Sequence, residues 1–92
     1  MTMDMDMNQR SSFVVVYQNR RNYRIPPVFL EQGGDSVTSD SRKAHVFQDL
    51  EAAIDATHLR PIYAKEFMVA QIREVYPVTV QRSWRLGRFV GF

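Results

Sequence analysis

Arginine and aromatic residues alternate in two short segments of this chain, and both residue types suit contacts with phosphate, carboxylate or another protein. The first segment, 17–24, has three arginines and two tyrosines, and the second, 82–89, has three arginines with Trp84 and a phenylalanine. The Arg guanidinium is planar, stays charged and donates hydrogen bonds in a fork that matches carboxylate or phosphate oxygens. Both segments are therefore candidate binding surfaces. The predicted contact residues are Tyr17, Arg20, Arg21, Tyr23, Arg24, Arg82, Trp84, Arg85 and Arg88.

Three interpretations of these segments remain open on composition alone. On a nucleic acid, arginines would pair with phosphates while the aromatic rings stacked on bases. On a protein interface, Trp, Tyr and Arg are the residues that dominate the binding energy. In a plain strand, the arginines would be solvated and the aromatic rings would face the core. Trp84 is predicted as a contact residue, but as the only tryptophan it also fits the third interpretation, because a single large ring can anchor a small core.

The charge of the chain is divided by segment. Residues 8–30 carry four arginines and no acid, and residues 75–92 carry three arginines and no acid. The middle, 31–74, holds eight acids against five basic residues, and the net charge is +2. If the two basic ends meet in the fold, they form one positive face and leave a negative face opposite.

No residue set for catalysis or metal binding is evident. The two histidines, His45 and His58, have Asp49 and Asp55 nearby in sequence but no third ligand. The pair Gly33–Gly34 lacks the lysine of a phosphate-binding loop, and no nucleophile elbow is present. We therefore expect no enzyme activity, no metal and no cofactor. The carboxylates are expected on a solvated acidic side: Glu51, Asp55, Glu66 and Glu74.

Length and composition indicate one small domain. Ninety-two residues can bury a single core. The chain has no cysteine, which excludes disulfides and zinc-thiolate sites and fits a reducing cytoplasm. No apolar run reaches the ~18 residues that a membrane span needs. Residues 1–11, with their Met/Asp alternation, are expected to be a flexible tail, and residues 12–92 to be the folded domain.

The first half of the domain is predicted to be mostly extended. The β-branched and aromatic run 13–17 indicates a strand buried on both faces. Residues 19–22 turn the chain, and residues 23–25 are expected to be extended because a proline follows them. Residues 28–30 are predicted as an edge strand after two prolines. The polar stretch 31–43 is predicted to be a mobile loop, since it is longer than most connections.

One helix and further strands follow. Residues 44–47 are a short strand candidate, and Asp49 is a plausible helix N-cap. The helix is expected to end near His58. Its apolar face is predicted to comprise Leu50, Ala53, Ile54 and the methyl group of Thr57.

The segment 66–75 fits either a helix or a strand, and the β-branched and aromatic residues favour a strand. Residues 76–80 are expected to continue as a bent or edge strand because of Pro77. Residues 81–92 are predicted to be an arginine-aromatic tail with Gly87 and Gly91 as flexible points. Together these elements predict an α+β domain, a small antiparallel sheet with one short helix packed on a face. The predicted core comprises Val14, Val16, Val46, Leu50, Ala53, Ile54, Phe67, Val69, Ile72 and Val78.

In its small size, missing cysteines, α+β element order, polarised charge and lack of a catalytic set, the chain resembles the small phage-encoded anti-CRISPR proteins. Within that group it is similar to inhibitors of type I surveillance complexes. The resemblance implies a non-catalytic inhibitor in the bacterial cytoplasm that docks on the ribonucleoprotein and keeps target DNA from binding or pairing with the guide RNA. Its expected partners are protein subunits of that complex, or the guide RNA itself.

Many inhibitors of this group are acidic mimics of DNA, whereas this chain has a net charge of +2 and basic ends. That difference favours arginine contacts with acidic protein or with the guide-RNA backbone, while the acidic middle faces basic subunits. The alternative is a free-standing nucleic-acid-binding module that uses the same arginine and aromatic clusters. The acids of the middle segment weigh against it, because they would repel a duplex.

Overall fold

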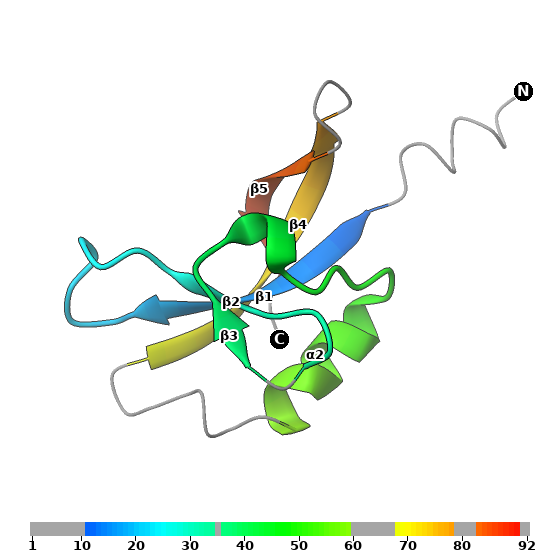
Figure 1. The fold of residues 1–92 in the computed structure, drawn as a ribbon. Coiled ribbons are helices and arrows are strands. Elements are labelled where there is room, and N and C mark those ends of the chain that lie inside the picture. Colours follow the sequence, from blue (N-terminus) through cyan, green and yellow to red (C-terminus); the bar gives the residue numbers. More distant parts are fainter. Residues whose placement is uncertain (1–10, 35, 60–67, 79–82, 91–92) are drawn as a thin grey trace, which may run out of the picture.

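The computed structural model describes residues 11–34, 36–59, 68–78 and 83–90, and it confirms the α+β class. Within these residues, a five-stranded antiparallel sheet with the order β3-β2-β1-β4-β5 carries one α-helix (Figure 1). The elements are β1 (Ser12–Asn19), β2 (Val28–Leu30), β3 (Val37–Thr38), the 3-10 helix η1 (Ser41–Lys43), α2 (Leu50–Leu59), β4 (Met68–Val78) and β5 (Ser83–Phe89). The predicted tail falls almost entirely on residues 1–10, which lie outside the described residues.

The central strand β1 is buried on both faces, as its sequence predicts. It pairs with β4 along its whole length, from Ser12 opposite Val75 to Asn19 opposite Met68. On its other edge it pairs with β2, so no main-chain edge of its middle faces water. Its side chains from Val14 to Tyr17 are at most 1% exposed. Because side chains alternate along a strand, they divide between two cores.

The core under α2 contains Val15, Tyr17, Leu30, Ala53 and Ile72. The helix begins where the sequence predicts, because Asp49 caps it. The Asp49 carboxylate accepts a hydrogen bond from the backbone N–H of Glu51 at 3.1 Å. The helix packs Leu50, Ala53 and Ile54 against this core and leaves Glu51 and Asp55 exposed, as predicted.

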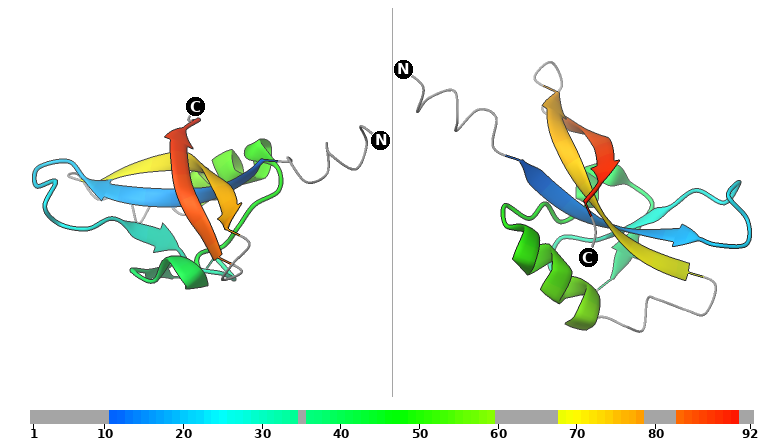
Figure 2. Two further views of the ribbon diagram at one scale, coloured as in Figure 1. Left: turned by 90° about the horizontal axis from the view of Figure 1, so that it is seen from above. Right: turned by 180° about the vertical axis from the view of Figure 1, so that it is seen from behind.

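A second core lies on the opposite face of the sheet. It contains Val14, Val16, Phe29, Ala44 and Val75, with the half-buried Val46 and Trp84 packed against it. The chain around η1 covers this face, and Figure 2 shows α2 and η1 on opposite sides of the sheet. The prediction of a strand over 44–47 is wrong. This segment makes only two isolated bridges. Ala44 pairs with Glu31, just after β2, and Phe47 pairs with Phe13 in β1, so the segment does not run alongside a single strand.

Residues 31–43 contain regular structure, which the sequence analysis did not predict. Gly33 and Gly34 adopt positive φ angles of 99° and 78°, which reverse the chain after β2. Residues Val37 and Thr38 then pair with Leu30 and Phe29 as β3. Strand β2 is therefore an inner strand and not the predicted edge. The prediction that residues 23–25 are extended is also wrong, because the Ile25 N–H closes a turn onto the Asn22 carbonyl at 3.2 Å.

The C-terminal half is a long hairpin of β4 and β5. The choice of strand for β4 is confirmed from Met68 onward, and the strand runs through Pro77. The predicted tail over 81–92 is instead a strand from 83 to 89, paired with β4. Gly87 lies inside this strand and is not a flexible point. A Cβ atom there would lie 2.4 Å from the Tyr76 ring and 2.7 Å from the Glu74 carbonyl oxygen.

Most of the predicted core is buried or half-buried in the structure. Ala53 and Ile72 are fully buried with the two predicted β1 valines, and Val69 is half-buried. Two predicted core residues, Phe67 and the side chain of Val78, lie outside the described residues. The predicted flexible point Gly91 also lies outside them. The buried apolar residues that the sequence analysis did not include are Val15, Tyr17, Phe29, Leu30, Ala44 and Val75.

Candidate interaction surfaces

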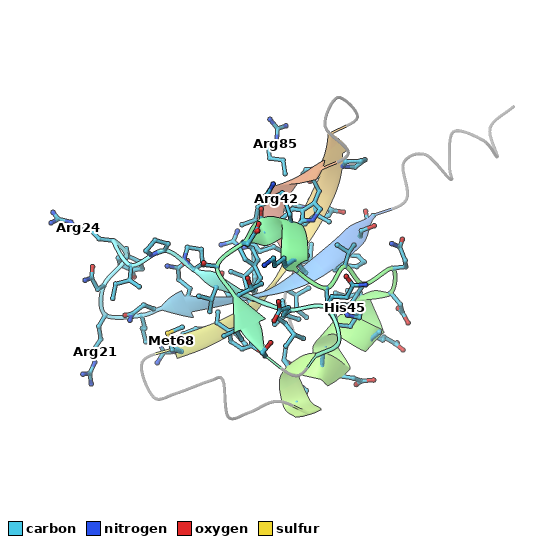
Figure 3. The ribbon with its side chains drawn as sticks, in the orientation of Figure 1. Arg21, Arg24, Arg42, His45, Met68 and Arg85 are labelled. Atoms are coloured by element: carbon cyan, nitrogen blue, oxygen red, sulfur yellow. The ribbon has the colours of Figure 1, made fainter. Side chains whose placement is uncertain are left out.

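The loop 20–27 between β1 and β2, here called the arginine loop, presents most of the first predicted contact group. Arg20, Arg21, Tyr23 and Arg24 are all exposed, and Tyr23 is 81% exposed. Figure 3 shows Arg21 and Arg24 pointing away from the body of the domain, at the far end of the sheet. No acid lies in this loop. The loop therefore offers three cations and one aromatic ring to a partner.

Side-chain hydrogen bonds give the arginine loop a defined shape. The buried Asn19 accepts hydrogen bonds from the backbone N–H groups of Arg21 and Asn22, both at 2.9 Å. Asn22 in turn accepts one from the Arg24 N–H at 3.0 Å. Asn side chains stabilise turns in this way, because they replace a backbone acceptor. The arginines thus start from a fixed main chain, which reduces the entropy lost on binding.

Tyr17 does not belong to this surface. The sequence predicts it as a contact residue, but its side chain is 1% exposed and lies in the core under α2. Strand periodicity explains the difference, because Tyr17 shares a face with Val15.

The second predicted group lies on β5. Arg85 and Arg88 are exposed, whereas Trp84 is half-buried and packs edge-on against Phe29, with ring centroids 5.8 Å apart. Trp84 is therefore partly a core residue, as the third interpretation of the sequence allows. Arg82 lies outside the described residues.

Glu74 joins several residues around the β4–β5 hairpin. Its carboxylate accepts hydrogen bonds from the hydroxyl groups of Ser11 and Tyr76, the latter at 2.9 Å, and lies 3.3 Å from the Arg88 guanidinium. The Ser11 and Tyr76 hydrogen bonds and the charge of Arg88 hold the pKa of Glu74 below its usual value. Donation to this carboxylate raises the pKa of Tyr76. Glu74 is only 8% exposed, so it does not belong to the predicted solvated acidic side.

The two basic groups do not form one face. Asn19, beside the arginine loop, pairs with Met68, whereas Arg85 pairs with Tyr76. Eight residues of β4 separate these two registers, and at ~3.3 Å per residue that distance is roughly 25 Å. Figure 3 shows Arg24 and Arg85 at well-separated places on the domain. A partner that contacts both groups must span much of the sheet.

An open pocket of about 310 Å³ lies beside Trp84 on the face opposite α2. Its lining residues are Gln32, Arg42, Ala44, His45, Val46 and Trp84. Arg42 is held by Asp40, with the guanidinium Nε 3.2 Å from the carboxylate. This hydrogen bond from Arg42 lowers the pKa of Asp40. The Arg42 charge is therefore shared with an internal acid, which makes the pocket a weaker anion site than the arginine loop.

The remaining candidates for chemistry stay apart in the described part of the chain. No three His, Asp or Glu side chains among these residues are grouped as metal ligands. Over the same residues, no helix is long and apolar enough to cross a membrane. No protein-family model, curated protein or solved structure matches the chain.

Two exposed apolar residues were not predicted from the sequence. Leu86 is 37% exposed and Phe89 is 52% exposed, and both lie on β5 next to the predicted arginines. Alternation of Trp84 and Leu86 across Arg85 is the signal that would have found Leu86, had β5 been recognised as a strand. Phe89 shares the face of Leu86 because of the register shift between β4 and β5, which simple alternation does not predict.

Proposed function

We propose that this protein is a non-catalytic docking domain that binds a negatively charged surface of a nucleic-acid-processing complex. The observation that carries the proposal is the arginine loop. Three exposed arginines and the exposed Tyr23 project from one end of the sheet, on a turn fixed by Asn19. Exposed Arg and Tyr on a preorganised loop are typical of binding surfaces.

The partner named by the resemblance is a CRISPR surveillance ribonucleoprotein in the cytoplasm of a bacterial host. Docking there would block target DNA by occupancy, since the arginines would contact acidic protein or guide-RNA phosphate. The acids on the outer side of α2, Glu51 and Asp55, are exposed, so they are available to basic subunits. Mixed charge of this kind favours one orientation of the partner over others.

The test is charge reversal in the arginine loop. The triple variant Arg20→Glu, Arg21→Glu, Arg24→Glu is expected to lose capture of a purified type I surveillance complex and to lose inhibition of its target-DNA binding. A control reverses Lys43, an exposed cation of η1. The control should retain capture, and both variants should keep the circular dichroism spectrum of the parent. Undiminished capture and inhibition by a folded triple variant would refute the proposal.

This triple is a cleaner test than reversal on β5. Arg88 contacts Glu74, whose side chain is only 10% exposed, so its reversal would place two like charges together. Such a variant could lose binding by perturbing the hairpin.

A free-standing nucleic-acid-binding module is the second candidate, and Tyr23 is the observation that favours it. A ring that is 81% exposed between arginines is placed to stack on an unpaired base. Fluorescence anisotropy with labelled single-stranded RNA and duplex DNA, from low to physiological salt, separates the two functions. Tight binding that persists at physiological salt and falls on Tyr23→Ala would establish the module. Binding that vanishes by physiological salt would leave the docking domain as the better account.

A further inference from the structure

Strand β5 is an edge of the described sheet, and its outer main chain is open among the described residues. Only β4 pairs with it, and the sheet order places β5 last. From Ser83 to Leu86 the strand pairs residue by residue with β4, and the register shifts only beyond that stretch. A regular open edge offers N–H and C=O groups to another extended chain.

The same strand carries an apolar row on the sheet face opposite α2. Leu86 pairs with Val75, which belongs to the core on that face, and Trp84 packs on the same core. Phe89 pairs with Arg73, two residues from Val75, so it shares this face. Leu86 and Phe89 remain 37% and 52% exposed. A partner strand could cover them with its own apolar side chains.

The charge of β5 specifies the partner further. Residues 75–92 contain no acid, and β5 itself carries Arg85 and Arg88. The Arg88 side chain is 76% exposed although it contacts Glu74, and Arg85 is exposed. Acidic side chains on an added strand would lie beside these two cations. A second copy of β5 would bring only arginines, and like charges across strands are destabilising.

We propose that the β5 edge binds an extended, acidic segment of a partner protein by strand addition. The inference deepens the proposed function and rests on it, because it identifies a protein, and not RNA, as the ligand of the second arginine group. Main-chain pairing along an open edge requires a peptide backbone. The exposed Leu86 and Phe89 likewise suit apolar side chains better than phosphates. The expected segment alternates Asp or Glu with apolar residues.

The experiment is selection of random twelve-residue peptides displayed on phage against the immobilised full chain. We expect enriched peptides in which acids alternate with Val, Ile, Leu or Phe. The variant Arg85→Glu should weaken binding of such a peptide about tenfold, which corresponds to ~1.4 kcal/mol. Selection on that variant should favour Lys and Arg in place of acids. The control Arg24→Glu, in the arginine loop, should bind the peptide like the parent.

Backbone N-methylation distinguishes strand addition from simple charge attraction. Two versions of a selected peptide are each N-methylated at alternate residues. One version lacks the backbone N–H donors on one edge of the peptide strand, and the other version lacks those on the opposite edge. One version should lose binding at least about tenfold, while the other binds as before. Amide hydrogen exchange of residues 83–89 should slow when the unmodified peptide is bound.

Three outcomes would overturn the inference: no enrichment of acidic peptides, equal binding of both methylated versions, or a dimer of the free protein with β5 amides already protected. These outcomes leave the proposed function intact if the arginine-loop triple variant still abolishes capture of the surveillance complex. Conversely, the peptide could bind at β5 while the triple variant still captures the complex undiminished. That pair of results would refute the docking role of the arginine loop and would leave the inference about the β5 edge standing.

Discussion

Replacement of Gly87 by alanine tests the close contact between the two strands of the C-terminal hairpin. The new methyl group would lie 2.4 Å from the Cε2 atom of the Tyr76 ring and 2.7 Å from the Glu74 carbonyl oxygen. The ring can rotate away, since Tyr76 is 42% exposed, but the carbonyl belongs to the paired main chain of β4. The strands must therefore separate locally, and the hydrogen bond from Tyr76 to Glu74 is expected to break.

The expected loss of stability follows from two opposing effects. Overpacking a tight site costs ~1–3 kcal/mol. Alanine also restricts the unfolded chain relative to glycine, which offsets ~0.4–1 kcal/mol of that cost. The net destabilisation is about 1–2 kcal/mol. For a domain of this size each kcal/mol lowers the melting temperature by ~4–8 °C, so we expect a decrease of roughly 5–15 °C.

The only tryptophan, Trp84, lies on the same strand as Gly87 and provides a fluorescence signal for urea and thermal unfolding. The control is the same substitution in a Tyr76→Ala background, where only the Glu74 carbonyl contact remains. Gly87→Ala should cost about half as much there, and the difference is the coupling energy of the pair. If Gly87→Ala is neutral or stabilising in the parent chain, β4 and β5 do not approach each other closely at this position, and the reasoning is refuted.

Three further predictions concern single polar side chains. Asp49→Ala removes the cap of α2 and should lower stability by about 1 kcal/mol in urea unfolding, whereas Asp49→Asn should retain most of it; equal losses would contradict the capping role. The hydrogen bonds of Glu74 lower its pKa from the reference 4.5, so their contribution to stability is present above that pH and is lost as the pH falls through the folded-state pKa. Glu74→Gln should reduce this acid-dependent loss in unfolding curves measured between neutral pH and pH 3, and an unchanged pH dependence would refute it. Asn19→Ala should speed amide exchange of Arg21 and Asn22 and weaken partner capture, while exchange in α2 stays as in the parent.

The elements that the sequence predicts correctly are those whose local pattern and tertiary setting agree. The run from Phe13 to Tyr17 is β-branched and lies in the middle of the sheet, so propensity and burial favour the same structure. Asp49 precedes an amphipathic run, and the helix begins beside it. In β4, Pro77 lies beyond Val75, the last residue that pairs with β1. The missing donor is therefore tolerated within an otherwise regular strand.

The elements that it predicts incorrectly depend on contacts between distant residues. Gly87 suggests flexibility in a short window, and only its contacts with the Tyr76 ring and the Glu74 carbonyl explain a glycine within a strand. Strand β3 has only two residues, too few to show an alternating pattern, and it forms by pairing with β2. In the candidate site, the exposure of the arginine loop follows from its composition. The burial of Tyr17 follows from strand register, which sequence alone does not fix.

The placement of β1 between two cores has a consequence for how the domain unfolds. Val15 and Tyr17 contribute to the packing under α2, while Val14 and Val16 contribute to the packing beside Trp84. Loss of either layer exposes half of the β1 side chains and leaves this central strand packed on one face only, so we expect the two layers to unfold as one cooperative unit. Helix loss by circular dichroism and Trp84 fluorescence should therefore follow the same transition. Ligands at the arginine loop and at the β5 edge, although far apart, would then both stabilise the same folded state.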